Sequence, residues 1–172
     1  MRFKLIAAAV LALAPFAAQA HGPTPQKVEE KIEIKAEPAK VWALVKDFAA
    51  PQAWHPAIAK VAVAGTERTV TLKAGGVELV ESQDESDDAT MTLGYRLSNE
   101  GVDAFPVSSY SASLVVTPKD GGSEVVWQGR GYRLDTSNEP PEGKDDASAV
   151  KALQDFFRTG LQGLKAKAEG AG

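Results

Sequence analysis

Residues 145–167 read DDASAVKALQDFFRTGLQGLKAK and hold the longest helical pattern of the chain. Apolar side chains recur there every three or four residues, which places them on one face of a helix. The members of this face are Val150, Leu153, Phe157, Leu161 and Leu164, with Phe156 widening it. About 23 residues at 1.5 Å each give a rod about 34 Å long, enough to cross a small domain. We therefore predict a long helix over 145–167 against which the other elements bury their apolar faces.

The chain before this helix carries mainly strand patterns. An alternating run at 28–34 predicts the first strand, and Pro38 suits the first turn of a short helix that ends before Pro51. Further strands are predicted at 58–63, 69–73, 77–81, 90–97, 107–117 and 124–132. An acidic turn is expected at 84–88 and a polar loop at 135–144. This order predicts an α+β fold with one antiparallel sheet packed against helices.

The first twenty residues have the three parts of an export signal. A positively charged start precedes an apolar run at 5–18, and Ala18-Gln19-Ala20 forms the small-x-small pattern that signal peptidase cuts. The apolar run is short for a membrane span, which favours a cleaved signal over an anchor. We therefore expect removal of residues 1–20, a periplasmic protein that begins at His21, and a single domain over 21–172.

Composition narrows the functional classes. A net charge of −4 over 172 residues makes nucleic acid and anionic membrane surfaces poor candidates as partners. The absence of cysteine excludes disulfides, thiol catalysis and thiolate metal sites. No serine stands in a G-x-S-x-G elbow, and no glycine pair is followed by the lysine of a phosphate-binding loop. We therefore expect no catalytic residues, no enzyme activity and no cofactor.

Metal binding has little support from the sequence. His21 and His55 are its only histidines, and an amino-terminal His21 could chelate a transition metal with its amine and imidazole, joined by His55. No spacing rule links these two positions, so we expect a histidine on a mobile tail and no metal site. The acidic segments at 84–88 and 135–146 lack the calcium-loop pattern and are expected to be solvated.

Aromatic side chains are the better indication of a site. Those on elements expected to meet between the sheet and the last helix are Trp54, His55, Tyr95, Tyr110, Trp127, Tyr132, Phe156 and Phe157. Large rings with polar tips line ligand pockets as well as protein cores. Strand alternation does not say which sheet face points inward. A ligand pocket and a packed core therefore both remain open for this set.

Several motifs resemble a known family. The segments VWALVKDF at 41–48 and WHPAI at 54–58 resemble the opening of the SRPBCC superfamily, in its polyketide cyclase/dehydrase-like branch. The segments PVSSYSA at 106–112 and VVWQG at 125–129 resemble its last two strands. The resemblance implies the helix-grip (START/Bet v 1-like) fold, a curved antiparallel sheet of about seven strands around a long C-terminal helix, with two short helices after the first strand. It supplies no catalytic residues, because this fold hosts binders, cyclases and accessory proteins alike.

A narrower resemblance rests on two segments. HGPTPQKV at 21–28 and DTSNEPPE at 135–142 resemble the MxaD family of small periplasmic accessory proteins of bacterial methanol oxidation. That resemblance implies a non-enzymatic role in the contact between quinone-dependent methanol dehydrogenase and its cytochrome c. The candidate partner surface consists of Asp135, Asn138, Glu139, Pro140, Pro141 and Glu142. The alternatives are a carrier of a small hydrophobic or redox-active ligand and a cyclase-like enzyme that uses His55 as acid or base.

Overall fold

The computed structural model of the chain describes residues 22–99 and 104–170. The strands are β1 (Gln26–Ile34), β2 (Ile58–Ala64), β3 (Glu67–Leu72), β4 (Glu78–Asp87), β5 (Thr92–Leu97), β6 (Val107–Lys119) and β7 (Gly122–Arg133). The helices are α1 (Pro38–Val45), the short 3-10 helix η1 (Pro51–Ala53) and α2 (Asp146–Glu169). The predicted export signal and His21 lie outside the described residues.

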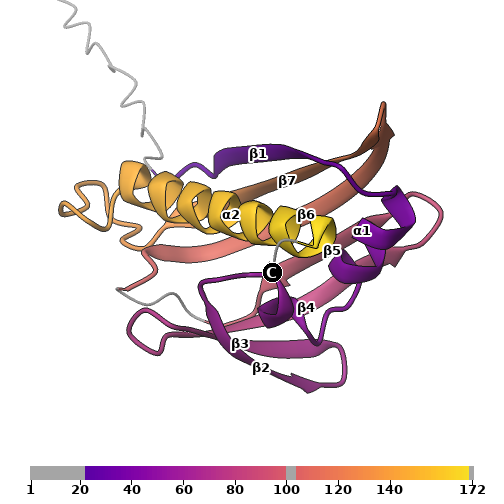
Figure 1. Cartoon of the computed structure of the whole chain (residues 1–172). Coiled ribbons are helices and arrows are strands. Elements are labelled where there is room, and N and C mark those ends of the chain that lie inside the picture. The colour runs from indigo at the N-terminus through magenta and orange to yellow at the C-terminus, as the bar shows by residue number, and fades with distance from the viewer. Residues whose placement is uncertain (1–21, 100–103, 171–172) are drawn as a thin grey trace, which may run out of the picture.

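One antiparallel sheet wraps around the last helix. Its seven strands lie in the order β1-β7-β6-β5-β4-β3-β2, so the chain crosses from one edge of the sheet to the other between β1 and β2. The crossing is made by α1 and η1. Helix α2 packs along β1 and β7, and Figure 1 shows it lying across the hollow side of the curved sheet. The predicted helix-grip fold, with two short helices after the first strand, is confirmed.

Helix α2 begins and ends where its sequence supplies caps. The Asp145 carboxylate accepts a hydrogen bond from the Ser148 backbone N–H at 2.8 Å and another from its hydroxyl at 2.6 Å. Such an N-cap satisfies donors that the first turn leaves unpaired. Gly170 ends the helix with φ 79°, a left-handed conformation that favours glycine. The predicted apolar face is buried at Leu153, Phe157, Leu161 and Leu164, while Val150 and Phe156 are half-buried.

The acidic turn predicted at 84–88 is wrong. Strand β4 continues through Asp87, and its pairing with β5 runs from Glu81 opposite Leu97 to Asp87 opposite Thr92. A register shift between Gln83 and Glu85 interrupts the ladder. Charged side chains are accommodated because this end of the strand lies largely exposed to water.

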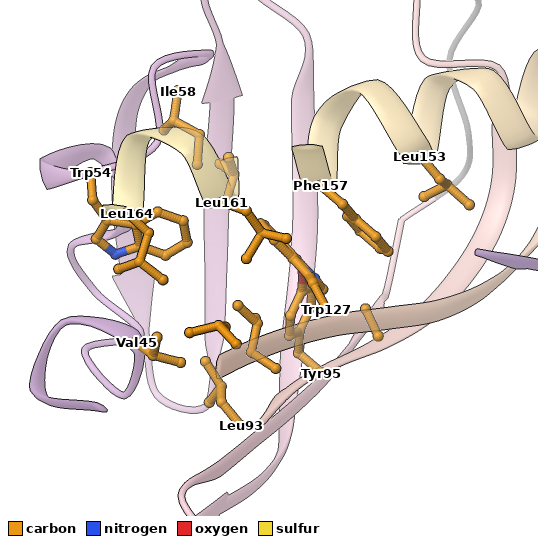
Figure 2. Close-up of a cluster of buried hydrophobic side chains, with 14 of the residues drawn as sticks. Val45, Trp54, Ile58, Leu93, Tyr95, Trp127, Leu153, Phe157, Leu161 and Leu164 are labelled. Carbon is orange, nitrogen blue, oxygen red and sulfur yellow. The ribbon is translucent and has the colours of Figure 1, made fainter. Parts of the chain in front are cut away.

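The interior is a single core between the sheet and α2. Its largest fully buried side chains include Trp127 from β7, Tyr95 from β5 and Phe157 from α2, and Figure 2 shows these three rings meeting beneath the helix. Over the described ranges, no helix combines the length and the apolar character needed to cross a membrane.

Candidate functional site

The turn Trp54-His55-Pro56 docks directly on α2. Helix η1 aims this turn at the helix, because the backbone N–H groups of Trp54 and His55 both donate to the Pro51 carbonyl, at 3.1 and 2.8 Å. The Trp54 indole N–H donates to the Leu44 carbonyl at 3.1 Å and ties the turn to α1. Both Trp54 and His55 are buried. The turn thus closes one end of the interior.

Two glycines of α2 make this close docking possible. A β-carbon on Gly160 would lie 2.6 Å from the His55 ring and 2.5 Å from Trp127, and one on Gly163 would lie 2.0 Å from the Trp54 carbonyl oxygen. Real β-carbons do not approach other atoms so closely, so only glycine fits at either position. The sequence analysis missed these residues. The available signal was a pair of glycines inside a helical pattern. Each glycine lowers the stability of a helix by about 1 kcal/mol relative to alanine, so its presence there indicates a close packing contact.

His55 is a neutral structural link in this arrangement. Its Nδ1 accepts the Ala57 backbone N–H at 3.2 Å, so the neutral ring carries its proton on Nε2. That Nε2–H donates to the Phe156 carbonyl of α2 at 3.1 Å. Burial lowers the pKa of His55 from 6.5 to about 4. With both ring nitrogens held by backbone groups, this geometry leaves neither free to exchange a proton with a ligand.

Most of the predicted aromatic set converges around Trp127. The Trp127 ring stacks on Phe157 at 4.6 Å between centroids and meets His55 edge-on at 5.9 Å. Trp54, Tyr95, Tyr110 and Phe156 join the same cluster. Phe105, which the sequence analysis missed, completes it between Tyr110 and Phe156 at 6.1 and 5.9 Å.

Tyr132 does not join this cluster. Its neighbours in β7 face α2, because a β-carbon on Gly131 would lie 2.6 Å from Leu153 and the Arg133 side chain bonds Asp146 at 3.0 Å. Successive side chains of a strand point to opposite faces, so Tyr132 leaves from the other face of the sheet.

A buried ion pair lies beside the aromatic cluster. The Arg68 guanidinium donates to the Glu81 carboxylate at 2.6 Å and to the Phe48 carbonyl at 3.1 Å. Its charge also lies 4.0 Å from the centre of the Phe48 ring, a favourable cation–π position. Arg68 is 6 % exposed and Glu81 1 % exposed, so both charges are removed from water.

Two phenols extend this ion pair into a network. The Tyr110 hydroxyl donates a short hydrogen bond to Glu81, and the Tyr95 hydroxyl accepts the Trp127 indole N–H at 3.1 Å. Burial and the nearby Glu81 carboxylate raise the pKa of both tyrosines, which therefore keep their protons. The Arg68 guanidinium lies 5.0 Å from the centre of the Tyr95 ring, which brings the Tyr95–Trp127 pair next to the ion pair. We call these five residues, Arg68, Glu81, Tyr95, Tyr110 and Trp127, the interior polar network.

Sequence reasoning missed the two charged members of the network. The signal was alternation: Arg68 shares its strand face with Val70 and Leu72, and Glu81 shares its face with Leu79. A charge in phase with an apolar face points into the core and needs a partner there.

The space between sheet and helix is almost filled. A cavity of about 10 Å³ remains, bordered by Arg68, Glu81, His55, Trp54 and Phe156 among others. That is about the room of one water molecule, whereas ligand pockets measure roughly 300–1,000 Å³. A wider hollow of about 560 Å³ lies on the opposite, solvent-facing side of the sheet. A ligand between sheet and helix therefore requires the enclosing side chains to move.

Arg133 organises the predicted partner surface. Its guanidinium donates to the carbonyls of Asp135 and Ser137, both at 2.8 Å, and to the Asp146 carboxylate at 3.0 Å. The Asp135 carboxylate in turn accepts the Ser137 backbone N–H at 2.8 Å. The exposed members of the predicted surface are Asn138, Glu139, Pro141 and Glu142, while Asp135 and Pro140 are half-buried. These residues form a single loop at the start of α2.

No group of three or more histidine or acidic side chains within the described ranges is placed to hold a metal ion. His21, one partner in the histidine hypothesis, lies outside those ranges. His55 uses both ring nitrogens for backbone hydrogen bonds.

Comparisons with known proteins agree with this architecture. Residues 25–169 match the family described as polyketide cyclase / dehydrase and lipid transport. The protein XoxI from Bacillus cereus superposes with a TM-score of 0.70 at 21 % identity, over 83 % of this chain and 94 % of its own. A protein from Thermobifida fusca superposes with a TM-score of 0.63 at 29 % identity, over 83 % of this chain and 92 % of its own.

The protein Ara h 8.0201 has a TM-score of 0.64 at 20 % identity, over 86 % of this chain and 99 % of its own. No curated protein matches the sequence. At these identities the structural likenesses establish the fold alone.

Proposed function

Since this chain belongs to the polyketide cyclase / dehydrase and lipid transport family, we propose that it is a non-enzymatic binder or carrier of a small, mainly apolar or redox-active ligand. The ligand would lie between the sheet and α2. The observation that carries the proposal is the interior polar network, which reaches a cavity inside an otherwise apolar core. Ligand pockets of soluble proteins are commonly apolar with a few convergent polar groups.

The energetics of the ion pair support a role beyond stability. Burying two charges costs as much as their attraction returns, so apolar side chains of similar volume would hold this core equally well. A guanidinium and a carboxylate in the same place can instead orient a ligand that carries a polar group. Within the described residues, the Tyr95 hydroxyl donates no hydrogen bond. It can therefore donate to a ligand that reaches it.

Entry of a ligand would require Phe156 and the Trp54-His55-Pro56 turn, which enclose the cavity, to move apart. Phe156 is half-buried and stacks against His55 at 4.2 Å between ring centres. The His55 side chain makes one hydrogen bond to α2, to the Phe156 carbonyl. Separation of the Trp54-His55-Pro56 turn from α2 would therefore enlarge the cavity.

Ligand titration tests the proposal. Trp54 and Trp127 border the cavity, so binding of decanoate or decylubiquinone should change tryptophan fluorescence to saturation. Leu114→Phe should fill the cavity and weaken binding at least tenfold, whereas Val115→Phe, on the other face of the same strand, should bind as the unmodified chain does. Thermal melting checks that both variants fold. Equal binding by the two variants, or no saturable signal from either probe, would contradict the proposal.

We further propose that the protein is an MxaD-like periplasmic accessory of methanol oxidation. Its partners would be methanol dehydrogenase or the cytochrome c that accepts its electrons. The support is the resemblance of 21–28 and 135–142, together with the exposed acidic loop that Arg133 holds in shape. Carboxylates on an exposed loop can steer association with a basic partner surface.

Reconstitution tests this second proposal. Purified protein should bind one of the two partners in a pull-down and change the rate at which the dehydrogenase reduces the cytochrome. Glu139→Lys combined with Glu142→Lys should weaken the effect, and Glu29→Lys, exposed on β1, should not. No binding and no rate change in the presence of the unmodified protein would refute it. Mass spectrometry of the protein from a periplasmic extract should show a chain that begins at His21.

A further inference from the structure

The two edge strands of the sheet differ in how they are protected. At one edge, β1 carries five charged residues in QKVEEKIEI and packs against α2. At the other edge, β2 reads IAKVAVA, with Lys60 as its single charge and no proline. Its pairing with β3 has one irregularity, between Ile58 and Lys60, and the stretch from Lys60 to Ala64 is regular. Natural sheets usually guard an open edge with charges, proline, a bulge or a covering element. Figure 1 shows β2 at the rim of the sheet, and Val63 on it is the one large apolar side chain exposed among the described residues, at 48 %.

The free hydrogen-bonding groups of β2 belong to Val61 and Val63. In β3, the Leu72 N–H donates to Val77 and the Thr66 carbonyl accepts from Gln83, so its even-numbered residues face β4. The odd-numbered residues of β3 therefore face β2, where they pair with Lys60, Ala62 and Ala64. The alternate residues of β2 direct their N–H and C=O groups to the open edge.

We propose that β2 pairs in antiparallel fashion with β2 of a second copy of this chain, about a two-fold axis at Ala62. In this register Val61 of each copy lies opposite Val63 of the other. Both copies then use the N–H and C=O groups that face the open edge. The exposed Val63 side chain becomes covered by an apolar neighbour on the same sheet face.

Charge complementarity selects this register. It places Lys60 opposite Ala64 of the second copy, and Ala64 is paired with Glu67 on the adjacent strand. Lys60 and that Glu67 then point from the same sheet face about 10 Å apart, two strand spacings, with only a methyl group between them. Their long side chains can meet across it, and the two-fold axis repeats the ion pair. Pairing centred on Val61 would instead place Lys60 beside Thr69, where no carboxylate stands.

The dimer should be weak. Pairing of one seven-residue strand with another, without packing of the faces, buries less than the roughly 1,200 Å² of a stable interface. A concentration-dependent increase in mass by sedimentation velocity is therefore expected for the unmodified protein. A disulfide cross-link between the two copies would capture the weak dimer at low concentration and report its register.

Cysteine substitution tests the register directly, because the chain has no cysteine of its own. Ala62→Cys places two thiols opposite each other at a non-hydrogen-bonded position, where α-carbons lie about 4.5 Å apart and a disulfide fits. Mild oxidation should give a dimer on a non-reducing gel. Ala64→Cys is the matched control, exposed on the same strand and face, and it should stay monomeric because its copies lie about 14 Å apart.

A second substitution separates strand pairing from random collision. Val63→Lys, added to Ala62→Cys, guards the edge with a charge and should slow disulfide formation at least tenfold. The melting temperature should stay the same, because Val63 directs no backbone hydrogen bond to β3. Equal cross-linking of Ala62→Cys and Ala64→Cys, no cross-linking of Ala62→Cys, or no effect of Val63→Lys would overturn the proposal. None of these outcomes bears on ligand binding in the interior.

Discussion

His55 couples the turn before β2 to α2, and its protonation should weaken the fold. In the unfolded chain its pKa is about 6.5, and burial lowers it to about 4 in the folded protein. Between these values the unfolded chain binds a proton that the folded chain does not. The contribution of neutral His55 to the free energy of unfolding is therefore fully present above about pH 6.5 and is lost as the pH falls toward 4. From this difference in pKa, the free energy of unfolding should be about 2 kcal/mol lower at pH 5 than at pH 7.

Urea unfolding at the two pH values measures this loss. His55→Gln keeps a side-chain donor near the Phe156 carbonyl but does not titrate, so its stability should change by at least about 1 kcal/mol less over the same interval. The same pH dependence in the variant and in the unmodified protein would show that another group titrates.

Gly163 shows that local preference and packing oppose each other at one residue. Alanine there would gain about 1 kcal/mol of helix propensity, yet its β-carbon would meet the Trp54 carbonyl oxygen at 2.0 Å. We expect Gly163→Ala to lower the unfolding free energy by about 1–3 kcal/mol, the usual cost of overpacking. Gln162→Ala, exposed on the same turn, should change it by less than about 0.5 kcal/mol. A Gly163→Ala variant more stable than the parent would rule out the tight docking of the turn.

At the scale of elements, Arg133 is the residue that joins β7, the 135–144 loop and α2. Arg133→Met removes three hydrogen bonds and leaves two loop carbonyls without their donor. We expect a stability loss of about 1–3 kcal/mol and faster proteolysis within the loop. Arg130→Met, exposed on the other face of the same strand, is the control and should alter neither. Unchanged cleavage of the loop in Arg133→Met would show that the loop holds its own shape.

The elements also show what the sequence could predict. Periodicity located α2 and most strands because a buried apolar stripe must repeat with the element. The end of β4 was missed because its exposed acidic residues resemble a turn, and pairing with β5 holds them extended. Gly160, Gly163, Arg68 and Glu81 were missed for a different reason. Local patterns mark these four residues as unusual, but the role of each depends on which distant segment packs against it, and local patterns do not name that segment.

At the scale of the whole molecule, variants of the interior polar network can show whether its charges stabilise the fold or bind a ligand. Arg68→Met alone leaves the buried Glu81 carboxylate without its counter-charge, which should cost about 3–5 kcal/mol. Arg68→Met combined with Glu81→Leu and Tyr110→Phe replaces every polar partner of that carboxylate by an apolar group. This triple variant should unfold within about 2 kcal/mol of the parent, or be more stable.

Binding of decanoate or decylubiquinone should nevertheless weaken at least tenfold in the triple variant, because the two charged groups that orient a polar end of the ligand are gone. The triple variant retains Trp54 and Trp127 at the cavity. Urea unfolding and a fluorescence titration therefore measure stability and ligand binding on the same protein. A triple variant as unstable as Arg68→Met would make the network structural. One that is stable and binds like the parent would separate the network from the ligand site. Only a stable fold that has lost the ligand assigns these charges to function.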